Sequence, residues 1–273
     1  MYLLRYSVFM IYFNSLGKYG GFGNQLFQYA VAYVHAKRFQ TDVCTTPHKS
    51  YYHEGYKMWS HFIADYIDLP LKISTDHTPK SEFNESNLLY NESIELIEDE
   101  TNLYGYFQTD KYFLTRKSEI ISIYKNHCFK NQVSSYFSDR GLNSSEVTGI
   151  HVRRNDFLYK QEYHPVQSLE YFETSINQCN TKHYLVVSDD KNWCKEVFGS
   201  RPNFTIVETD NDIVDFYILS ECRNQIISNS TFGWWAAYLN TNSDKIVISP
   251  KNWYGVYGNQ HLSDLIPNNW KLI

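Results

Sequence analysis

The stretch Gly149-Ile150-His151-Val152-Arg153-Arg154-Asn155-Asp156-Phe157 joins a run of β-branched and apolar residues directly to a pair of arginines. Residues 147–152 predict a short buried strand with the arginines at its carboxyl end, where ligands bind in open α/β sheets. Neighbouring side chains on an extended backbone face opposite ways, so one guanidinium can enter a cleft while the other anchors the loop. The stretch therefore predicts a diphosphate site, and the alternative is a surface ion pair with Asp156.

The chain from residue 147 onward alternates strand-like and helix-like segments. Strands are predicted at 147–152, 183–188, 204–208, 225–228 and 245–249. Helices are predicted between them near 168–177, 192–198, 213–221 and 231–238. This alternation predicts a parallel sheet wrapped by helices, which is the kind of unit that holds a nucleotide. We expect two domains, at residues 1–140 and 141–273.

Two more polar segments follow predicted strands of this second domain. The first is Ser188-Asp189-Asp190, where a carboxylate would accept from ribose hydroxyls or guanine nitrogens, or would cap the next helix. The second contains Ser230 and Thr231 at the start of a helix, where hydroxyls and free amides would receive phosphate oxygens. The alternative for the second is an ordinary helix cap.

The amino-terminal segment predicts a strand, a glycine-rich loop and a helix. Residues 1–13 are apolar, but Arg5 interrupts a run far below the roughly 20 residues that a spanning helix needs. We therefore expect a first strand and neither a signal peptide nor a transmembrane segment. Residues 17–25 form the glycine-rich loop, in which a phosphate or sugar would sit above Gly23 and Asn24. A tight structural turn is the alternative, since the spacing matches neither common nucleotide-binding loop.

Composition limits the classes of function. Hydrophobic residues make up 42% and aromatic residues 17%, which excludes a disordered chain. The net charge of −5 comes without a basic run, so no nucleic acid partner is expected. The five cysteines have no CxxC or metal-ligand spacing and predict small core residues in a reducing compartment. We expect a cytoplasmic protein, either free or peripherally associated with a membrane.

One motif points to a metal. Asp210-Asn211-Asp212 has the D-x-D form that metal-dependent sugar-nucleotide transferases use, but it precedes a predicted helix that it would simply cap. An arginine pair and a divalent metal are two solutions to the same leaving-group problem, and the chain already shows the first. We therefore expect no metal and no cofactor.

Three islands of sequence, in their order and spacing, resemble the signatures of the α-1,2-fucosyltransferase family, glycosyltransferase family 11. The islands are GGFGNQLFQYA (20–30), HVRRNDF (151–157) and SNSTFGWWAAYL (228–239). The resemblance covers roughly residues 20–254 and is poor at 41–140. It implies an α/β, GT-B-like fold of two Rossmann-type halves with a donor cleft between them. GDP-fucose would be held mainly by the carboxyl half and the acceptor by the amino half.

The resemblance also implies roles for individual residues. Arg153 would bind the donor's β-phosphate and neutralise the departing GDP. The remaining residues predicted to contact or support GDP-fucose are Gly23, Asn24, His151, Arg154, Ser188, Asp189, Asp215, Ser230, Thr231 and Phe232. Among these, Asp189 and Asp215 would contact the ribose or guanine, and Arg154 would support the loop. The predicted catalytic set is Arg153 with Asp156, a further support of the loop, and Glu162.

The identity of a general base stays open. Glu162 and His164 follow the arginine loop and could reach an acceptor, but an exposed loop residue and a structural histidine are the alternatives. One departure from the family concerns the turn, because Asn155 stands where the family usually has glycine. Asn tolerates a left-handed backbone better than most residues, so we expect it to take over that conformation.

The resemblance predicts an inverting, metal-independent transfer of L-fucose from GDP-fucose to the 2-hydroxyl of a β-galactoside. Three rivals stay open. The first is a transferase of other specificity, such as an α-1,6-fucosyltransferase or a metal-dependent hexosyltransferase that uses Asp210 and Asp212. The second is a non-catalytic sugar-binding module, which would have no use for Arg153. The third and most distant is a nicotinamide-dependent oxidoreductase, whose glycine spacing the chain lacks.

Overall fold

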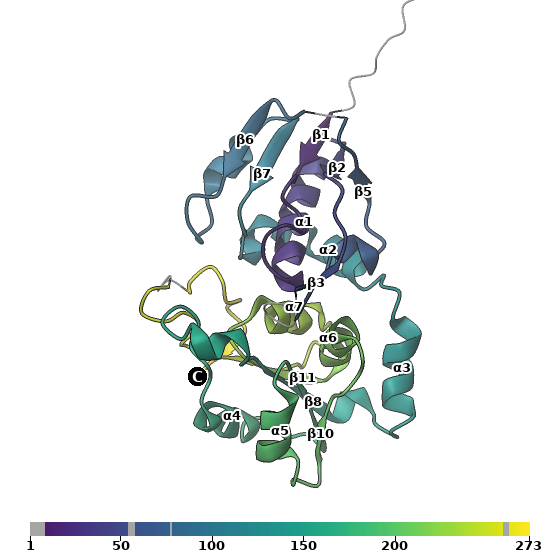
Figure 1. Cartoon of the computed structure of the whole chain (residues 1–273), viewed down its shortest axis with the longest axis vertical. Coiled ribbons are helices and arrows are strands. Elements are labelled where there is room, and N and C mark those ends of the chain that lie inside the picture. Colours follow the sequence, from purple (N-terminus) through teal and green to yellow (C-terminus); the bar gives the residue numbers. More distant parts are fainter. Residues whose placement is uncertain (1–8, 54–57, 77, 259–261) are drawn as a thin grey trace, which may run out of the picture. The chain divides into compact units, whose positions relative to one another are not determined.

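The computed structural model describes residues 9–53, 58–76, 78–258 and 262–273. The chain divides into two compact units, Met1–Asn126 and His127–Ile273. Sequence patterns placed the boundary after residue 140, whereas this division assigns residues 127–140, with the helix α3, to the second unit. Each unit contains its own parallel sheet (Figure 1).

Unit 1 is built on a five-stranded sheet with the order β5-β2-β1-β7-β6. Its strands are β1 (Met10–Tyr12), β2 (Asp42–Thr45), β5 (Leu71–Ile73), β6 (Ser81–Asn84) and β7 (Thr101–Tyr104). The helices are α1 (Phe22–Arg38) and α2 (Lys117–Tyr124), and a separate antiparallel pair is formed by β3 (Tyr51–His53) and β4 (Met58–Ser60). Short 3-10 turns lie at Ile63–Asp65, Glu92–Leu96, Asp110–Tyr112 and Leu114–Arg116.

The predicted strand, glycine loop and helix of unit 1 are confirmed for the described residues. β1 ends at Tyr12 and α1 begins at Phe22; residues 1–8 of the predicted strand lie outside the described part. Helix α1 is buried along most of its length against the sheet, and Leu26 and Ala30 are fully buried. The glycine loop is therefore held between a central strand and a buried helix.

Unit 2 is built on a six-stranded parallel sheet with the order β10-β9-β8-β11-β12-β13. Its strands are β8 (Val147–Val152), β9 (His183–Ser188), β10 (Phe204–Ile206), β11 (Asn224–Ile227), β12 (Val247–Ser249) and β13 (Lys271–Leu272). Its helices are α3 (Lys130–Ser138), α4 (Leu169–Ile176), α5 (Lys191–Phe198), α6 (Asp212–Glu221) and α7 (Thr231–Leu239). The 3-10 turns are Ser144–Glu146 and Asp156–Tyr159.

Helices cover both faces of this second sheet, with α6 and α7 on one face and α4 and α5 on the other (Figure 1). All of β8 is buried, as its β-branched and apolar residues predicted. β8 lies between β9 and β11 in the middle of the sheet, so its carboxyl end is flanked by the loops that follow both neighbours. The predicted parallel α/β sheet is confirmed.

Candidate functional site at the carboxyl edge of the second sheet

The loops after β8, β9 and β11 meet at one edge of the sheet. The strands are in parallel register, with Val152 opposite Ser188 and His151 opposite Ile227. The hydroxyl of Ser228 donates to the carbonyl oxygen of His151 at 2.9 Å and accepts from the backbone nitrogen of Arg153 at 3.1 Å. Ser228 therefore joins the ends of β8 and β11 and fixes where the first arginine leaves the sheet.

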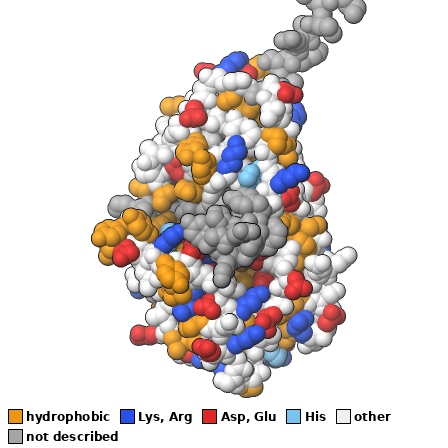
Figure 2. Space-filling model, viewed as in Figure 1, with side chains coloured by type: hydrophobic (Ala, Val, Ile, Leu, Met, Phe, Trp, Pro, Cys, Tyr) orange, Lys and Arg blue, Asp and Glu red, His pale blue; other side chains and the backbone are white. Residues whose placement is uncertain are grey.

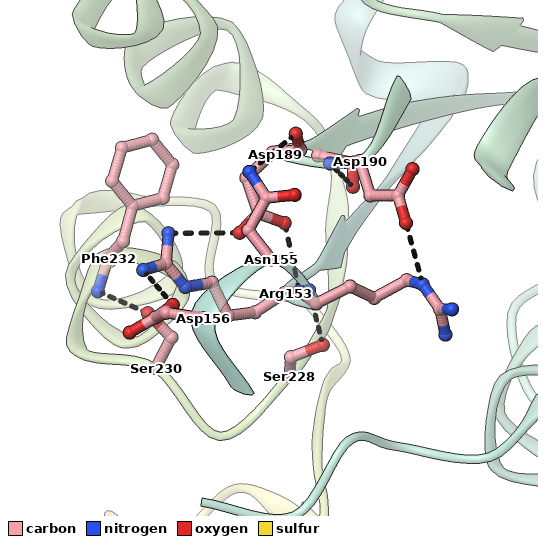
Figure 3. Close-up of polar contacts among 10 residues, drawn as sticks. Arg153, Asn155, Asp156, Asp189, Asp190, Ser228, Ser230 and Phe232 are labelled. Carbon is pink, nitrogen blue, oxygen red and sulfur yellow. Dashed lines mark hydrogen bonds and ion pairs between the residues drawn. The ribbon is translucent and has the colours of Figure 1, made fainter. Parts of the chain in front are cut away.

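Arg153 lies between two carboxylates (Figure 3). Its Nη2 is 2.6 Å from Oδ1 of Asp156, and its Nη1 is 3.1 Å from Oδ2 of Asp189. The side chain points toward Ser230 and Phe232 at the start of α7 (Figure 3). A guanidinium has five N–H donors and the two carboxylates engage only some of them. The Arg153 side chain is 21% exposed, so part of it is accessible to a ligand.

Arg154 anchors the loop to the neighbouring turn. Its Nε donates to Oδ2 of Asp190 at 3.0 Å, and its guanidinium lies 4.2 Å from the centre of the Trp193 ring. Its backbone nitrogen donates to Oδ1 of Asp189 at 2.9 Å. The two arginine side chains thus point in different directions. Arg153 pairs with the carboxylate of Asp156, and Arg154 pairs with the carboxylate of Asp190.

The expected left-handed conformation of Asn155 is wrong. Asn155 has φ −25° and ψ −88°, so its φ is negative. Its side-chain amide instead donates to the carbonyl oxygen of Asp189 at 3.0 Å. The turn survives because this hydrogen bond and the Arg154 contacts tie it to the loop after β9, and no glycine-like backbone is needed.

His151 is buried beneath the start of α7. Its ring stacks on Phe232 with 5.2 Å between centroids, and Gly233 leaves the space, since an added Cβ there would lie 2.7 Å from Nδ1. Burial, with a smaller contribution from the positive charge of Arg153, lowers the pKa of His151 to about 3. His151 is therefore a neutral ring that supports Phe232.

The two carboxylates predicted to contact ribose or guanine are engaged with protein donors. Burial raises the pKa of Asp189, which Arg153 opposes. Burial likewise raises the pKa of Asp215, which accepts from Thr209 Oγ1 at 2.6 Å and from Lys191 Nζ at 3.4 Å. Their contacts with a nucleotide stay predictions.

The helices that border the site begin with residues whose side chains cap them. Ser230 accepts from the backbone nitrogen of Phe232 at 3.3 Å at the start of α7, where Thr231 is the first helical residue. Asp190 caps α5 by accepting from Trp193, while the hydroxyl of Ser188 accepts from Asp190. The predicted helix-cap alternatives are thus present.

The D-x-D segment, residues 210–212, also lies at the start of a helix. Asn211 caps α6 by accepting from the backbone nitrogen of Ile213 at 2.9 Å. Within the described ranges, no three His, Cys, Asp or Glu side chains are grouped to hold a metal ion. Asp212 is the first residue of α6.

Glu162 lies on an exposed loop that is hydrogen-bonded to a second loop at residues 255–257. The carbonyl oxygens of Glu162 and Tyr163 accept from the backbone nitrogens of Tyr257 and Gly255, each at 2.9 Å. Tyr159 and Tyr257 are 87% and 70% exposed there. Figure 2 shows hydrophobic side chains gathered at the left of the view, where Figure 1 draws this pair of loops.

His164 follows two residues after Glu162, and its ring stacks on Phe157 with 4.9 Å between centroids. Burial lowers the pKa of His164, while the nearby carboxylate of Asp156 raises it. Either Glu162 or His164 thus stays a candidate base.

Gly23 and Asn24 belong to unit 1, in the first turn of α1. Gly23 is buried, Asn24 is half-buried, and the carboxamide oxygen of Asn24 accepts from Gln108 Nε2 at 2.9 Å. Their predicted approach to the diphosphate stays a prediction. Sequence reasoning missed Gln108, and it missed Ser228 and Trp193 as supports of the arginine loop.

Comparisons with known proteins agree with this picture. The model of glycosyl transferase family 11 matches residues 97–273. The O-antigen biosynthesis glycosyltransferase WbnK of Escherichia coli is 26% identical over 92% of this chain and 97% of its own. An alpha-1,2-colitosyltransferase of Escherichia coli is 26% identical over 86% and 90%. Galactoside alpha-(1,2)-fucosyltransferase 2 of Bos taurus is 24% identical over 83% and 67%.

Among solved structures, NodZ alpha-1,6-fucosyltransferase co-crystallized with GDP matches with a TM-score of 0.55 at 14% identity, over 84% of this chain and 91% of that chain. The two parallel α/β sheets and this likeness show a fold of the GT-B class. The chain belongs to glycosyl transferase family 11. It is an enzyme similar to the galactoside 2-α-L-fucosyltransferases.

In the part of the chain that the structure describes, no helix is long and apolar enough to cross a membrane.

Proposed function

We propose that this enzyme transfers L-fucose from GDP-fucose to the 2-hydroxyl of a β-galactoside, with inversion and without a metal. The observation that carries the proposal is the placement of Arg153 at the carboxyl end of the central strand β8, beside the start of α7. The guanidinium and the amides at a helix start are both donors suited to a diphosphate. The similarity to α-1,2-fucosyltransferases supports the choice of sugar and linkage.

In the proposed reaction the acceptor oxygen bonds to the anomeric carbon as that carbon's bond to the β-phosphate oxygen breaks. Negative charge then develops on the leaving GDP, and fixed donors aimed at it lower the barrier. Arg153 would supply the positive charge that neutralises the leaving diphosphate, and Phe232 and Ser230 would border the phosphates. The hydroxyl proton would pass to Glu162 or His164, or to water if bond breaking runs well ahead of attack.

A second donor is favoured by one finding, the similarity over 86% of the chain to an alpha-1,2-colitosyltransferase. Colitose is L-fucose without its 3-hydroxyl group, so the same diphosphate site would serve both sugars. A buried polar group that hydrogen-bonds the 3-hydroxyl would distinguish them.

A donor screen tests the proposal. We expect transfer from GDP-fucose to lactose-type acceptors, no transfer from UDP or CMP sugars, and unchanged rates with EDTA. NMR of the product would show an α-1,2 linkage, which from a β-linked donor means inversion. GDP-colitose as the better donor would favour the second candidate, and loss of activity with EDTA would refute metal independence. Failure to bind GDP would favour a non-catalytic sugar-binding protein.

A further inference from the structure

A group of exposed aromatic side chains lies on the two hydrogen-bonded loops of unit 2. Tyr163 and Tyr257 are 53% and 70% exposed, and their ring centroids are 5.8 Å apart. On the same two loops, Tyr159 and Val256 are 87% and 78% exposed. Single exposed apolar side chains are ordinary, whereas several gathered on one surface mark an interaction site. We call Tyr159, Tyr163 and Tyr257 the tyrosine patch.

The main chain fixes the two loops that carry the tyrosine patch against each other. The backbone nitrogens of Gly255 and Tyr257 donate to the carbonyl oxygens of Tyr163 and Glu162. Gly255 permits this close approach, since an added Cβ there would lie 2.3 Å from the Glu162 carbonyl oxygen. The rings are therefore exposed on a fixed base, so a ligand that covers them orders little else.

Both loops are joined to the candidate site within unit 2. The first loop begins with Asp156, whose carboxylate pairs with Arg153. The second loop is held by the buried Asn229, the residue before Ser230, because its Nδ2 donates to the carbonyl oxygen of Trp253 at 2.9 Å. The tyrosine patch is therefore continuous with the site that the proposed function assigns to the donor.

The chemistry of the tyrosine patch suits a sugar. A tyrosine ring offers its face to the apolar face of a pyranose and its hydroxyl to the hydroxyls of the sugar. Residues 156–164 and 254–258 contain two acidic side chains and one basic side chain, a net charge of −1 with histidine neutral. That charge does not favour an anionic membrane surface. Glu162, a candidate base for the acceptor hydroxyl, directly precedes Tyr163.

We propose that Tyr163 and Tyr257 form a platform on which a sugar ring of the acceptor glycan stacks. A galactose ring fits this role, because its axial 4-hydroxyl leaves the hydrogens of C3, C4 and C5 together on the opposite, apolar face. The inference rests on the proposed function, since it names residues that hold the acceptor of that reaction. It assigns an acceptor contact to unit 2, in addition to the contacts with the donor.

Two substitutions of Tyr257 test the platform. Tyr257→Ala removes one ring, so we expect KM for a lactose-type acceptor to rise about 3- to 10-fold. Tyr257→Phe keeps the ring and should restore KM to within about 2-fold of wild type. KM for GDP-fucose and Kd for GDP should stay unchanged in both variants. A merely structural role would not separate the acceptor from the donor in this way.

A second variant and a control complete the set. Tyr163→Ala should raise KM for the acceptor in the same way as Tyr257→Ala. Leu96→Ala, in the 3-10 turn Glu92–Leu96 of unit 1, removes a side chain that is 82% exposed and should leave every constant unchanged. Saturation-transfer NMR with lactose and the GDP-bound enzyme would measure acceptor binding without turnover. Its Kd should rise by the same factor as KM.

Other occupants of the tyrosine patch would give different results. Sedimentation with phosphatidylglycerol vesicles that Tyr257→Ala abolishes, with acceptor affinity unchanged, would show a membrane contact. A dimer that the same variant dissociates in light scattering, again with acceptor affinity unchanged, would show a contact with a second copy. Either result would overturn the inference, as would unchanged acceptor KM and Kd in both alanine variants.

The failure of this inference can be told apart from failure of the proposed function. Wild-type protein that neither binds GDP nor uses GDP-fucose would refute the proposed function, and the inference with it. Wild-type protein that does both, with unaltered acceptor affinity in Tyr163→Ala and Tyr257→Ala, would refute the inference alone.

Discussion

At the scale of single residues, the site is organised by the partners of Arg153. Its two carboxylates, Asp156 and Asp189, contribute more negative charge than one guanidinium cancels. An arriving diphosphate must therefore share Arg153 with these anions or displace one. The two carboxylates hold the guanidinium in place before the donor binds. The Arg153 side chain therefore loses less conformational freedom when the donor binds.

Substitution of Arg153 should slow transfer strongly. We expect Arg153→Ala to reduce kcat/KM about 10²- to 10³-fold, because a fixed donor to the leaving group is lost. Arg153→Lys should restore little activity. The compact ammonium of lysine lacks the planar set of donors with which a guanidinium contacts two carboxylates and a phosphate at once. Steady-state kinetics with varied GDP-fucose would measure both.

The matched control is Arg223→Ala. This exposed arginine lies just before β11, at the opposite edge of the same sheet, and its loss should leave turnover unchanged. Near-normal turnover in Arg153→Ala, with the control also normal, would remove Arg153 from the mechanism.

At the scale of elements, the turn between β1 and α1 offers two adjacent glycines with different demands. Gly20 has φ +78°, and a Cβ there would lie 2.7 Å from the Cβ of Asn24. Gly21 has φ −75°, and a Cβ there would meet nothing within 4 Å. We expect Gly20→Ala to destabilise the fold by about 1–2 kcal/mol from its backbone conformation alone, and to weaken donor binding by displacing Asn24.

Gly21→Ala should leave the thermal midpoint and KM for GDP-fucose within error of wild type. Denaturant unfolding and donor kinetics of the two variants side by side would measure this contrast. Equal behaviour of the two alanine variants would contradict the role assigned to the Gly20 conformation.

The elements differ in how well sequence predicts them. β8 and β9 were predicted to the residue, because each is a short run of mainly β-branched and apolar residues followed by a polar turn. β5 and β6 were not predicted, since most of their side chains are exposed and no apolar run marks them. Pairing with β2 and β7 defines these strands, and a sequence pattern carries no such long-range information.

The contacts of the site also differ in how well sequence predicts them. Sequence predicted that Arg153 and Asp189 both lie at the carboxyl edge of the sheet, because the carboxyl ends of parallel strands share an edge, but it did not predict the ion pair between them. The contact between Gln108 and Asn24 depends on the positive φ of Phe107, which no residue preference predicts. The negative φ of Asn155 was missed because a hydrogen bond to Asp189 decides it.

At the scale of the whole molecule, each unit contains a buried neutral histidine. Burial lowers the pKa of His35 to about 4 and that of His151 to about 3. An unfolded histidine titrates near pH 6.5, so between these values the unfolded chain binds more protons. Stability should therefore fall as pH falls below about 6.5, by about 1.4 kcal/mol per pH unit for each histidine. Denaturant unfolding at pH 7 and pH 5 would measure it.

His35→Leu is the variant that isolates unit 1. Both ring nitrogens of His35 are buried without a hydrogen-bond partner in the described structure, so an apolar side chain removes the titration at little cost. Buried carboxyls with raised pKa, such as Asp215, act in the opposite sense, so the difference between wild type and variant is the informative quantity. An identical pH slope in both proteins would contradict the assignment.

The burial of the thiols has a practical consequence. All five cysteines are described and unbridged, and Cys44, Cys179, Cys194 and Cys222 are buried, as small core residues should be. Burial raises the pKa of each of these four, so none of them will react readily with a maleimide. Cys128 is exposed and lies two residues after Asn126, where the first unit ends. A fluorophore attached there would label the native enzyme at a single point beside the junction, ready to report whether donor binding moves one half of the chain against the other.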